Sequence, residues 1–419
     1  NWESYFGGSV WEPVPGTNKY YLHSFHKDQP DLNWQNPILR EEIYKMINWW
    51  LDKGIAGFRI DAIINIKKDL EWRSLPSDRE NGLVPVPESL VNAQSIEPFL
   101  QELKERTFAK YNAFTVGEVF NETDEELHFF IGKDGVFSSI FDFKQTMLGQ
   151  EGKGWFDHAL PTADELKESI FQAHERADSI GVLSTIIENH DEPRGVSHYI
   201  AEGQVNDTSK KALGTIQILR KGIPFIYQGQ EIGMENQVFE SVEDFDDIAT
   251  INGYHVAKEA GLSEEEALAV IANYSRDNAR TPMQWTREPG LGFSDGPAWL
   301  ISPKPDVAVN VEDQEKDPNS ILNYYRQLTA LYRHPLYGNT IRFGDMIPAY
   351  RDRENIIAFE RRGDKRLLVV SNFQNRQATL ELPAPIKTVV LNNTAGLFQE
   401  GDQVLELVPY QTVVLELVE

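Results

Sequence analysis

The stretch Gly57-Phe58-Arg59-Ile60-Asp61 ends a short apolar run with a carboxylate, and the fold can be worked out from it in both directions. The run 55–60 is too short for a helix and directly follows Gly54, which favours a short buried strand. Upstream, residues 37–51 carry apolar side chains at helical spacing, and Asn36 can cap that helix. A helix followed by a buried strand is the repeating unit of a parallel α/β sheet.

The same order of helix and apolar strand recurs along the chain. We expect helices over 96–110, 162–179 and 208–220, followed in turn by strands over 113–116, 182–187 and 224–227. One extra strand spans 136–143. Together with the strand ending at Ile60, these make five predicted parallel strands. Their spacing fits the βα units of a (β/α)8 TIM barrel, which take roughly 30 residues each. A closed barrel needs eight strands. We therefore expect strands 1–3 to lie upstream of Asn1, so that this chain is N-terminally truncated.

The pattern changes along the chain in a way that predicts three domains. Residues 1–35 are aromatic, rich in Gly and Pro and weakly periodic, as in an irregular excursion. Residues 36–338 carry the barrel units and end with a helix over 319–333. Residues 339–419 alternate with period two, which predicts a C-terminal antiparallel β-sandwich with strands over 356–360, 366–371, 388–391 and 412–417.

Two further segments place carboxylates just after buried strands. They are Val116-Gly117-Glu118-Val119 and Glu188-Asn189-His190-Asp191-Glu192-Pro193. Barrel enzymes display their chemistry at the C-terminal ends of the strands, where all three segments are expected. Two carboxyl groups that face each other across a sugar are the minimum equipment for breaking a glycosidic bond. The ordered set of three segments predicts a glycosidase.

Each carboxylate taken alone has an ordinary alternative. Arg59 and Asp61 share one face of their strand, so the guanidinium would keep Asp61 ionised, as a nucleophile requires; a plain buried ion pair is the alternative. Glu118 at a buried strand end would have a raised pKa and suit a general acid, whereas a solvated loop glutamate would not. His190 and Asp191 could be half of a metal site or part of a Ser-His-Asp triad. The sequence shows neither more ligands nearby nor a nucleophile elbow.

Composition narrows the classes of partner. The 419 residues hold 40 Lys and Arg against 65 Asp and Glu, a net charge of −25, which disfavours nucleic acid and anionic membrane surfaces. The chain has no Cys, so disulfides, thiolate metal sites and a thiol nucleophile are excluded. We find no signal peptide and no apolar run of about 18 residues, and we expect a cytoplasmic protein without a membrane partner. The sequence leaves the oligomeric state open.

Jointly, these motifs resemble glycoside hydrolase family 13, the α-amylase superfamily, and within it the oligo-1,6-glucosidase and α-glucosidase group. Gln29-Pro30-Asp31-Leu32-Asn33 resembles that group's marker near the end of its B domain, and residues 222–229 resemble the strand 8 segment. Residues 276–285, with the sequence RDNARTPMQW, are highly specific to the group. The resemblance implies that 1–35 end the B-domain excursion and that the barrel enters at strand 4. The three carboxylate segments would then follow strands 4, 5 and 7.

The resemblance also implies roles for individual residues. Asp61 would be the nucleophile, Glu118 the acid/base and Asp191 the residue that stabilises the transition state through sugar hydroxyls. Arg59 and His190 would line the subsite of the non-reducing glucose. Arg276 would bind the 4-hydroxyl of that glucose and make the enzyme exo-acting, although Arg280 lies close by in sequence. We expect no metal ligand and no cofactor; a structural calcium would belong to the missing N-terminal part.

Ala62, directly after Asp61, bears on substrate preference. In the group a Val at this position goes with α-1,6 cleavage and smaller residues go with α-1,4 linkages. We therefore expect a retaining, exo-acting α-glucosidase that releases glucose from short α-glucans, with maltose-type substrates slightly favoured. The alternatives are an oligo-1,6-glucosidase or dextran glucosidase on isomalto-oligosaccharides, a trehalose-6-phosphate hydrolase, a sucrose isomerase or hydrolase, and a catalytically dead, transporter-associated binding relative.

Overall fold

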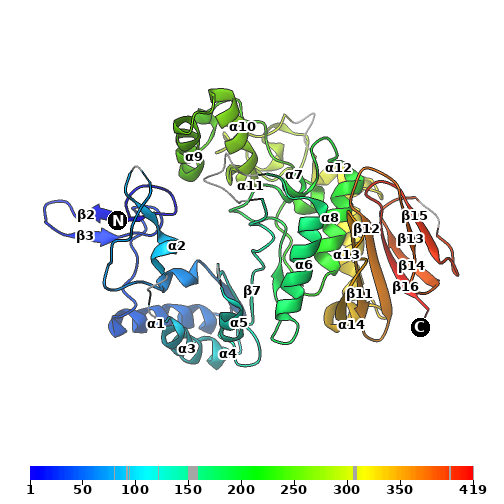
Figure 1. Ribbon diagram of the computed structural model, residues 1–419, viewed down its shortest axis with the longest axis horizontal. Helices are drawn as coiled ribbons and strands as arrows, with labels where there is room; N and C mark the ends of the chain where they lie inside the picture. Colours follow the sequence, from blue (N-terminus) through cyan, green and yellow to red (C-terminus); the bar gives the residue numbers. More distant parts are fainter. Residues whose placement is uncertain are drawn as a thin grey trace. The chain divides into compact units, whose positions relative to one another are not determined.

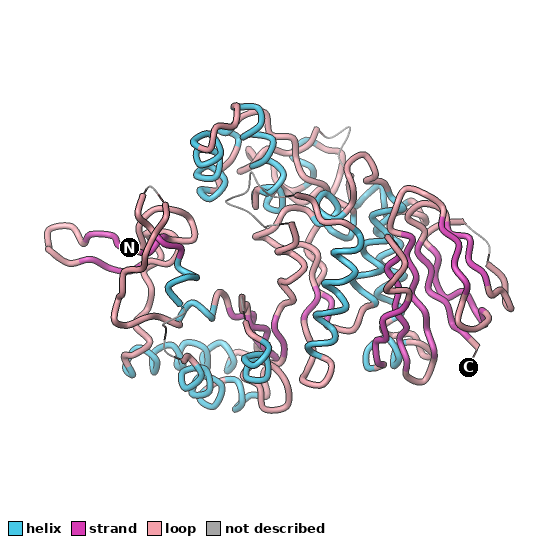
Figure 2. Tube along the Cα trace, viewed as in Figure 1, coloured by secondary structure: helices cyan, strands magenta, loops and turns pink. Residues whose placement is uncertain are grey.

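Figure 1 shows the computed structural model of the chain, which describes residues 1–79, 81–90, 93, 95–120, 122–149, 159–304, 309–395 and 398–418. The chain divides into two compact units. The first unit comprises Asn1–Phe141 and Ser179–Val182, and the second comprises Asp142–Asp178 and Leu183–Glu419. Each unit mixes helices and strands (Figure 2).

The first unit is built on a parallel sheet with the order β4-β6-β7. The three strands are β4 (Gly57–Ile60), β6 (Phe114–Gly117) and β7 (Ser139–Ile140). In the β4–β6 ladder Ile60 lies opposite Gly117, so both strands end at the same level. The predicted parallel strands of this unit are confirmed, although β7 is shorter than the run 136–143 suggested.

Two glycines allow these strands to approach closely. A Cβ added at Gly57 would overlap the backbone carbonyl oxygen of Phe114 on β6. A Cβ at Gly117 would lie 2.5 Å from the ring of Phe137. The glycines therefore set the spacing of the strands that lead to Asp61 and Glu118.

The helices of the first unit begin and end where the caps predict, with one exception. Helix α1 (Pro37–Asp52) is capped by the Asn36 side chain, which accepts from the Ile38 amide. The helix predicted over 96–110 is instead two helices, α3 (Glu97–Arg106) and α4 (Phe108–Tyr111). Thr107 between them has φ −131° and ψ −87°, outside the helical region, and its hydroxyl donates to the Leu103 carbonyl.

The apolar stripe of α1 is largely exposed. Only Tyr44 and Leu51 are buried on this helix, while four large apolar side chains are 42–73% exposed: Ile38, Met46, Trp49 and Trp50. Among the described residues β4 pairs with β6 alone, so its other edge has no neighbour in the ladders. An apolar helix face beside an open strand edge is a surface that parallel sheets normally cover.

The N-terminal excursion and the connections of the first unit are short elements. They are β1 (Trp2–Glu3), β2 (Trp11–Pro13), β3 (Tyr20–Leu22), β5 (Val84–Pro85), α2 (Val86–Ser89) and α5 (Asp124–Phe130). Strands β2 and β3 form an antiparallel hairpin, and β1 pairs with β5 in parallel.

The second unit contains the last two predicted parallel strands and the helices around them. Strands β8 (Ser184–Thr185) and β9 (Ile223–Pro224) pair in parallel. The three predicted helices are confirmed as α6 (Ala163–Ala177), α8 (Asp207–Leu219) and α13 (Ile321–Leu331). The other α-helices of the unit are α7 (Gly195–Tyr199), α9 (Ile248–Glu259), α10 (Glu264–Tyr274), α11 (Asp277–Arg280), α12 (Val311–Lys316) and α14 (Gly338–Phe343). No helix in the described parts of either unit is long and apolar enough to span a bilayer.

The C-terminal residues form the predicted antiparallel structure. A five-stranded sheet has the order β10 (Asp345–Ala349), β11 (Ile356–Arg362), β12 (Arg366–Asn372), β16 (Thr412–Leu417) and β14 (Ile386–Asn392). A separate hairpin joins β13 (Ala378–Glu381) to β15 (Val404–Leu407). The sequence did not predict β10, β13 and β15, since β10 is an edge strand that contains Pro348 and the other two are only four residues long.

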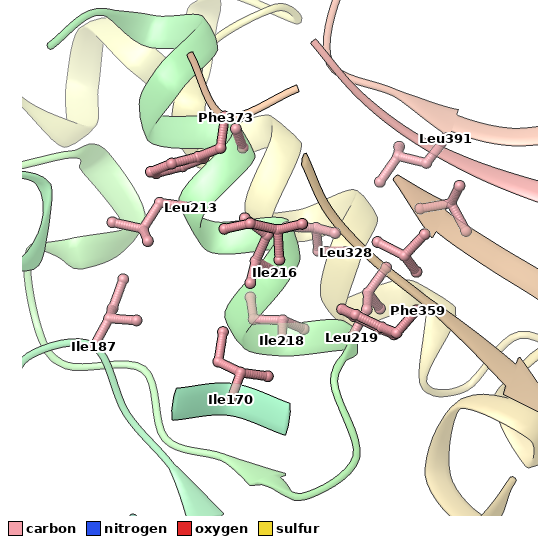
Figure 3. Packing of buried hydrophobic residues seen from close by; sticks show 14 of the residues in the cluster. Ile170, Ile187, Leu213, Ile216, Ile218, Leu219, Leu328, Phe359, Phe373 and Leu391 are labelled. Carbon is pink, nitrogen blue, oxygen red and sulfur yellow. The ribbon is translucent and has the colours of Figure 1, made fainter. Parts of the chain in front are cut away.

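Alternation along the C-terminal strands supplies two apolar cores. Phe359 of β11 faces the core shared with α6, α8 and α13 (Figure 3), while its neighbour Ala358 faces the core shared with the β13–β15 hairpin. Val369 and Val370 of β12 divide in the same way. The sheet is therefore covered on both faces, which explains why all six residues of β16 are buried.

We predict that Gly57→Ala destabilises the fold. The new Cβ would meet a backbone carbonyl, which can move only if β4 and β6 separate, so we expect a loss of about 1–3 kcal/mol in the free energy of unfolding. Urea denaturation measures the loss. Gly296→Ala is the matched control, because its Cβ would make only an ordinary 3.5 Å contact with Ser294. Equal unfolding midpoints for Gly57→Ala and the control would contradict the packing account.

Candidate active site

Asp61 and Glu118 leave adjacent strands at the same edge of the first unit's sheet. Asp61 follows β4 and Glu118 follows β6, and the Glu118 amide donates to the Ile60 carbonyl across the ladder at 2.9 Å. The parallel register alone therefore brings the two carboxylates to one place, as the sequence predicts for strand ends.

Arg59 binds both carboxylates with one guanidinium. Its Nη1 donates to Asp61 Oδ1, and its Nη2 lies 2.7 Å from Glu118 Oε1. Since Nη1 and Nη2 belong to the same planar group, the two carboxyls face a common point.

The two carboxylates differ in exposure. The Asp61 side chain is 76% exposed, whereas the Glu118 side chain is 5% exposed. An exposed carboxylate can approach an incoming sugar directly. The buried Glu118 carboxyl is instead enclosed by protein groups.

Ala62 contributes a backbone contact that the sequence did not predict. Its φ of 41° and ψ of 34° put it in the left-handed region, and its amide donates to Glu118 Oε2 at 2.7 Å. Arg59 and this amide therefore hold one oxygen each of the Glu118 carboxyl. Residue type carries no signal of a main-chain donor, so only the structure could reveal it.

Asp191 lies in the second unit, after β8, within a cluster of cationic groups. The ring of His190 contacts its Oδ2 at 3.0 Å, and Oδ1 receives Arg276 Nη1 at 3.2 Å and Arg280 Nη2 at 3.0 Å. Arg276, which the sequence analysis assigned, and the nearby Arg280 both bind Asp191. The predicted site residues thus form two clusters, one in each unit.

Asp247 supports this cluster from behind and was missed by the sequence analysis. Its buried carboxylate accepts from Arg276 Nε at 3.1 Å and from Nη2, and it also caps α9 by accepting from the Thr250 amide at 3.0 Å. The sequence shows a capping residue ahead of a helix but gives no sign that the cap also binds Arg276.

A second buried pair ties three chain segments together near Asp191. Arg194 Nη1 binds Glu188 Oε1 at 2.9 Å and the Gln228 carbonyl at 2.8 Å, and the Gly195 amide donates to Glu188 Oε2. The Arg194 guanidinium also lies 5.4 Å from the centre of the Tyr227 ring. Glu188 and Arg194 flank the His190-Asp191 step, so the pair fixes the ends of the loop that carries Asp191.

The cationic cluster determines the ionisation of Asp191. Burial raises the pKa of this carboxyl, but the hydrogen bond with His190 and the charges of Arg276 and Arg280 outweigh burial and bring the pKa down to about 2. Glu192 shows the opposite balance, since burial and the nearby Asp191 charge raise the pKa of its carboxyl to about 8. Asp191 is therefore an ionised acceptor at neutral pH.

The described residues contain no group of three or more His, Asp or Glu side chains arranged to hold a metal ion. The side chains that contact Asp191 are all hydrogen-bond donors. Such surroundings suit a carboxylate that accepts hydrogen bonds from sugar hydroxyls rather than one that binds a metal cation. The expectation that the protein needs no cofactor stays a prediction.

We predict that Asp191→Asn lowers stability in a pH-dependent way. A folded-state pKa near 2 lies below the usual value of about 3.9, so Asp191 stabilises the fold above pH 4 and loses that contribution as the pH falls through 2. We expect the variant to lose about 1–2 kcal/mol at pH 7, with the difference shrinking between pH 4 and pH 2. Urea denaturation at several pH values measures this difference, with Asp295→Asn at an exposed site as the control. A difference that does not change with pH would contradict the assignment.

Comparisons with known proteins agree with this geometry. Residues 1–336 match the family described as "Alpha amylase, catalytic domain", and residues 356–414 match "Alpha-amylase SusG C-terminal domain". The chain is similar to "Probable oligo-1,6-glucosidase 3" of Bacillus subtilis, with 41% identity over 79% of this chain and 59% of that protein. It is 33% identical to "Oligo-1,6-glucosidase" of Bacillus cereus over 100% of this chain and 75% of the relative.

Solved structures confirm the fold. The isomaltulose synthase of Klebsiella sp. LX3 superimposes with a TM-score of 0.92 and 31% identity, over 100% of this chain and 75% of that one. The chain spans 59% of the length of the Bacillus subtilis relative and about three quarters of the others. The expected TIM-barrel architecture with a C-terminal antiparallel domain is confirmed by these matches. The chain belongs to the α-amylase family of glycoside hydrolases.

Proposed function

We propose that this protein is a retaining, exo-acting α-glucosidase that releases glucose from the non-reducing ends of short α-glucans. The observation that carries the proposal is the single guanidinium of Arg59, which binds both Asp61 and Glu118 at the ends of adjacent strands. Relatives named oligo-1,6-glucosidase, in Bacillus cereus among others, support an α-glucosidase activity.

In the first step Glu118, in its protonated form, gives its proton to the glycosidic oxygen while Asp61 attacks the anomeric carbon. The carbon–oxygen bond to the leaving group breaks and a β-glucosyl ester of Asp61 forms. The exposure of Asp61 suits attack, and the enclosed position of Glu118 suits a proton donor. Asp191 would accept hydrogen bonds from glucose hydroxyls, and its low pKa keeps it ionised for that role.

In the second step Glu118, now ionised, takes a proton from a water molecule. The resulting hydroxide attacks the anomeric carbon and releases Asp61, so that glucose leaves with its α configuration retained. Arg276 and His190 would bind the non-reducing glucose and restrict the enzyme to chain ends. Arg280, which binds Asp191 as closely as Arg276 does, would share this role.

The linkage preference rests on Ala62 and on the relatives, which point in different directions. A small side chain after the nucleophile favours α-1,4 substrates such as maltose, while the names of the relatives favour α-1,6 substrates. A pocket difference of this size is worth only about 1–3 kcal/mol, so we propose that both linkages are cleaved and that maltose is slightly preferred. A Bacillus subtilis relative named trehalose-6-phosphate hydrolase is 32% identical, which keeps that activity as the second candidate.

We predict that Asp61→Asn abolishes glucose release from maltose and isomaltose, because the amide cannot form the glucosyl ester. The loss should reach at least about 10³-fold in kcat with the fold intact by circular dichroism. The assay uses a form of the protein that releases glucose before the substitution is made. Asp295→Asn serves as the matched control. A fully active Asp61→Asn variant would refute the nucleophile assignment.

We predict that Ala62→Val raises the ratio of kcat/KM for isomaltose to that for maltose. A β-branched side chain is strained at the φ of 41° that residue 62 adopts, so we expect the variant to have a lower free energy of unfolding. The ratio is insensitive to this loss, because both substrates sample the same folded enzyme. We expect a shift of about 5- to 100-fold, and an unchanged ratio would remove Ala62 from the specificity argument.

A further inference from the structure

Trp299 is a large exposed aromatic side chain whose position is nevertheless fixed. The side chain is 65% exposed, and its indole N–H donates to Asp246 Oδ2 at 3.0 Å. The next residue, Leu300, is buried, and Ile301 packs against the apolar cluster that contains Phe245. The flat face of the indole is therefore presented to solvent by a segment that is anchored directly after Trp299 and held by the contact with Asp246.

The residue that holds Trp299 belongs to the loop that supports Arg276. Asp246 is exposed and holds the indole, while the adjacent Asp247 is buried and binds Arg276. The backbone amides of both Asp246 and Asp247 donate to Oδ2 of the buried Asp277, at 2.8 and 3.0 Å, and Asp277 directly follows Arg276. The loop, the indole and Arg276 thus form one rigid assembly.

This assembly places Trp299 beyond the Asp191 cluster rather than within it. Asp191 contacts Arg276, Arg276 contacts Asp247, and the next residue along the chain holds Trp299. Consecutive side chains at 246 and 247 point to opposite sides, one outward to the indole and one inward to Arg276. Three residues, Arg276, Asp247 and Asp246, therefore lie on the contact path from Asp191 to the indole, which places Trp299 outside the subsite of the reacting glucose and beside a more distant sugar.

We propose that Trp299 and Asp246 form a subsite for a second or third glucose unit of the substrate, an inference that rests on the proposed function. A pyranose ring has an apolar face of C–H groups, which an exposed indole removes from water. Its hydroxyl groups lie around the rim of the ring, within reach of a carboxylate at the edge of the indole such as Asp246. An aromatic plane with an adjoining carboxylate offers both kinds of contact at once.

The test is the binding of maltotriose and of methyl α-glucoside, measured by calorimetry in the Asp61→Asn background so that neither ligand is turned over. Methyl α-glucoside fills only the reacting position, whereas maltotriose extends beyond it. Trp299→Ala should raise the Kd for maltotriose about tenfold, which corresponds to a loss of about 1.4 kcal/mol in binding free energy. The Kd for methyl α-glucoside should change by less than about twofold. Trp299→Phe, which keeps an aromatic face, should retain maltotriose binding within about threefold.

Phe343→Ala is the control, because Phe343 is a 72% exposed aromatic residue on α14 that should affect neither ligand. Equal maltotriose binding with and without Trp299, an equal loss for both ligands, or no binding of maltotriose by the parent protein would each overturn the subsite. Failure of the proposed function looks different: the protein with Asp61 intact would release no glucose, while maltotriose binding still depended on Trp299.

Discussion

The guanidinium of Arg59 is the interaction on which the carboxylate pair of the first unit depends. It projects from β4 between two carboxylates that the parallel register has already brought to one edge, and it binds both. A single cation bound to both carboxyl groups offsets their mutual repulsion. Gly57 is part of the same arrangement, because a Cβ at this position would overlap the Phe114 carbonyl of β6.

The carboxylate cluster of the second unit follows the same principle with the charges reversed. A single carboxylate, Asp191, is surrounded by His190, Arg276 and Arg280, and Asp247 balances the excess positive charge from behind. Burial would otherwise favour the neutral acid, so the cluster is what keeps Asp191 ionised. The pair formed by Glu188 and Arg194 holds the loop that carries this carboxylate.

Local signals in the sequence predicted several of the elements and the placement of Asp61 and Glu118 at strand ends. Caps such as Asn36 and the carboxylates at strand ends identified α1, β4 and β6 and the residues that follow them. Long-range contacts were not predictable. In the sequence Asp247 is recognisable only as a helix cap, because its partner Arg276 lies 29 residues further along the chain. The hydrogen bond from the Ala62 amide comes from the main chain, so the residue type does not indicate it. The break at Thr107 and the exposure of Trp49 and Trp50 likewise depend on surroundings that periodicity does not report.

Capture of the covalent intermediate tests the central claim most directly. A slowly hydrolysed, activated α-glucosyl fluoride would be reacted with the catalytically competent protein, and the modified residue would be found by peptide mass spectrometry. The account predicts one glucosyl unit esterified to Asp61, with no label after Asp61→Asn. A label on another carboxylate, or steady hydrolysis without any labelled peptide, would contradict a retaining mechanism built on Asp61, Arg59 and Glu118.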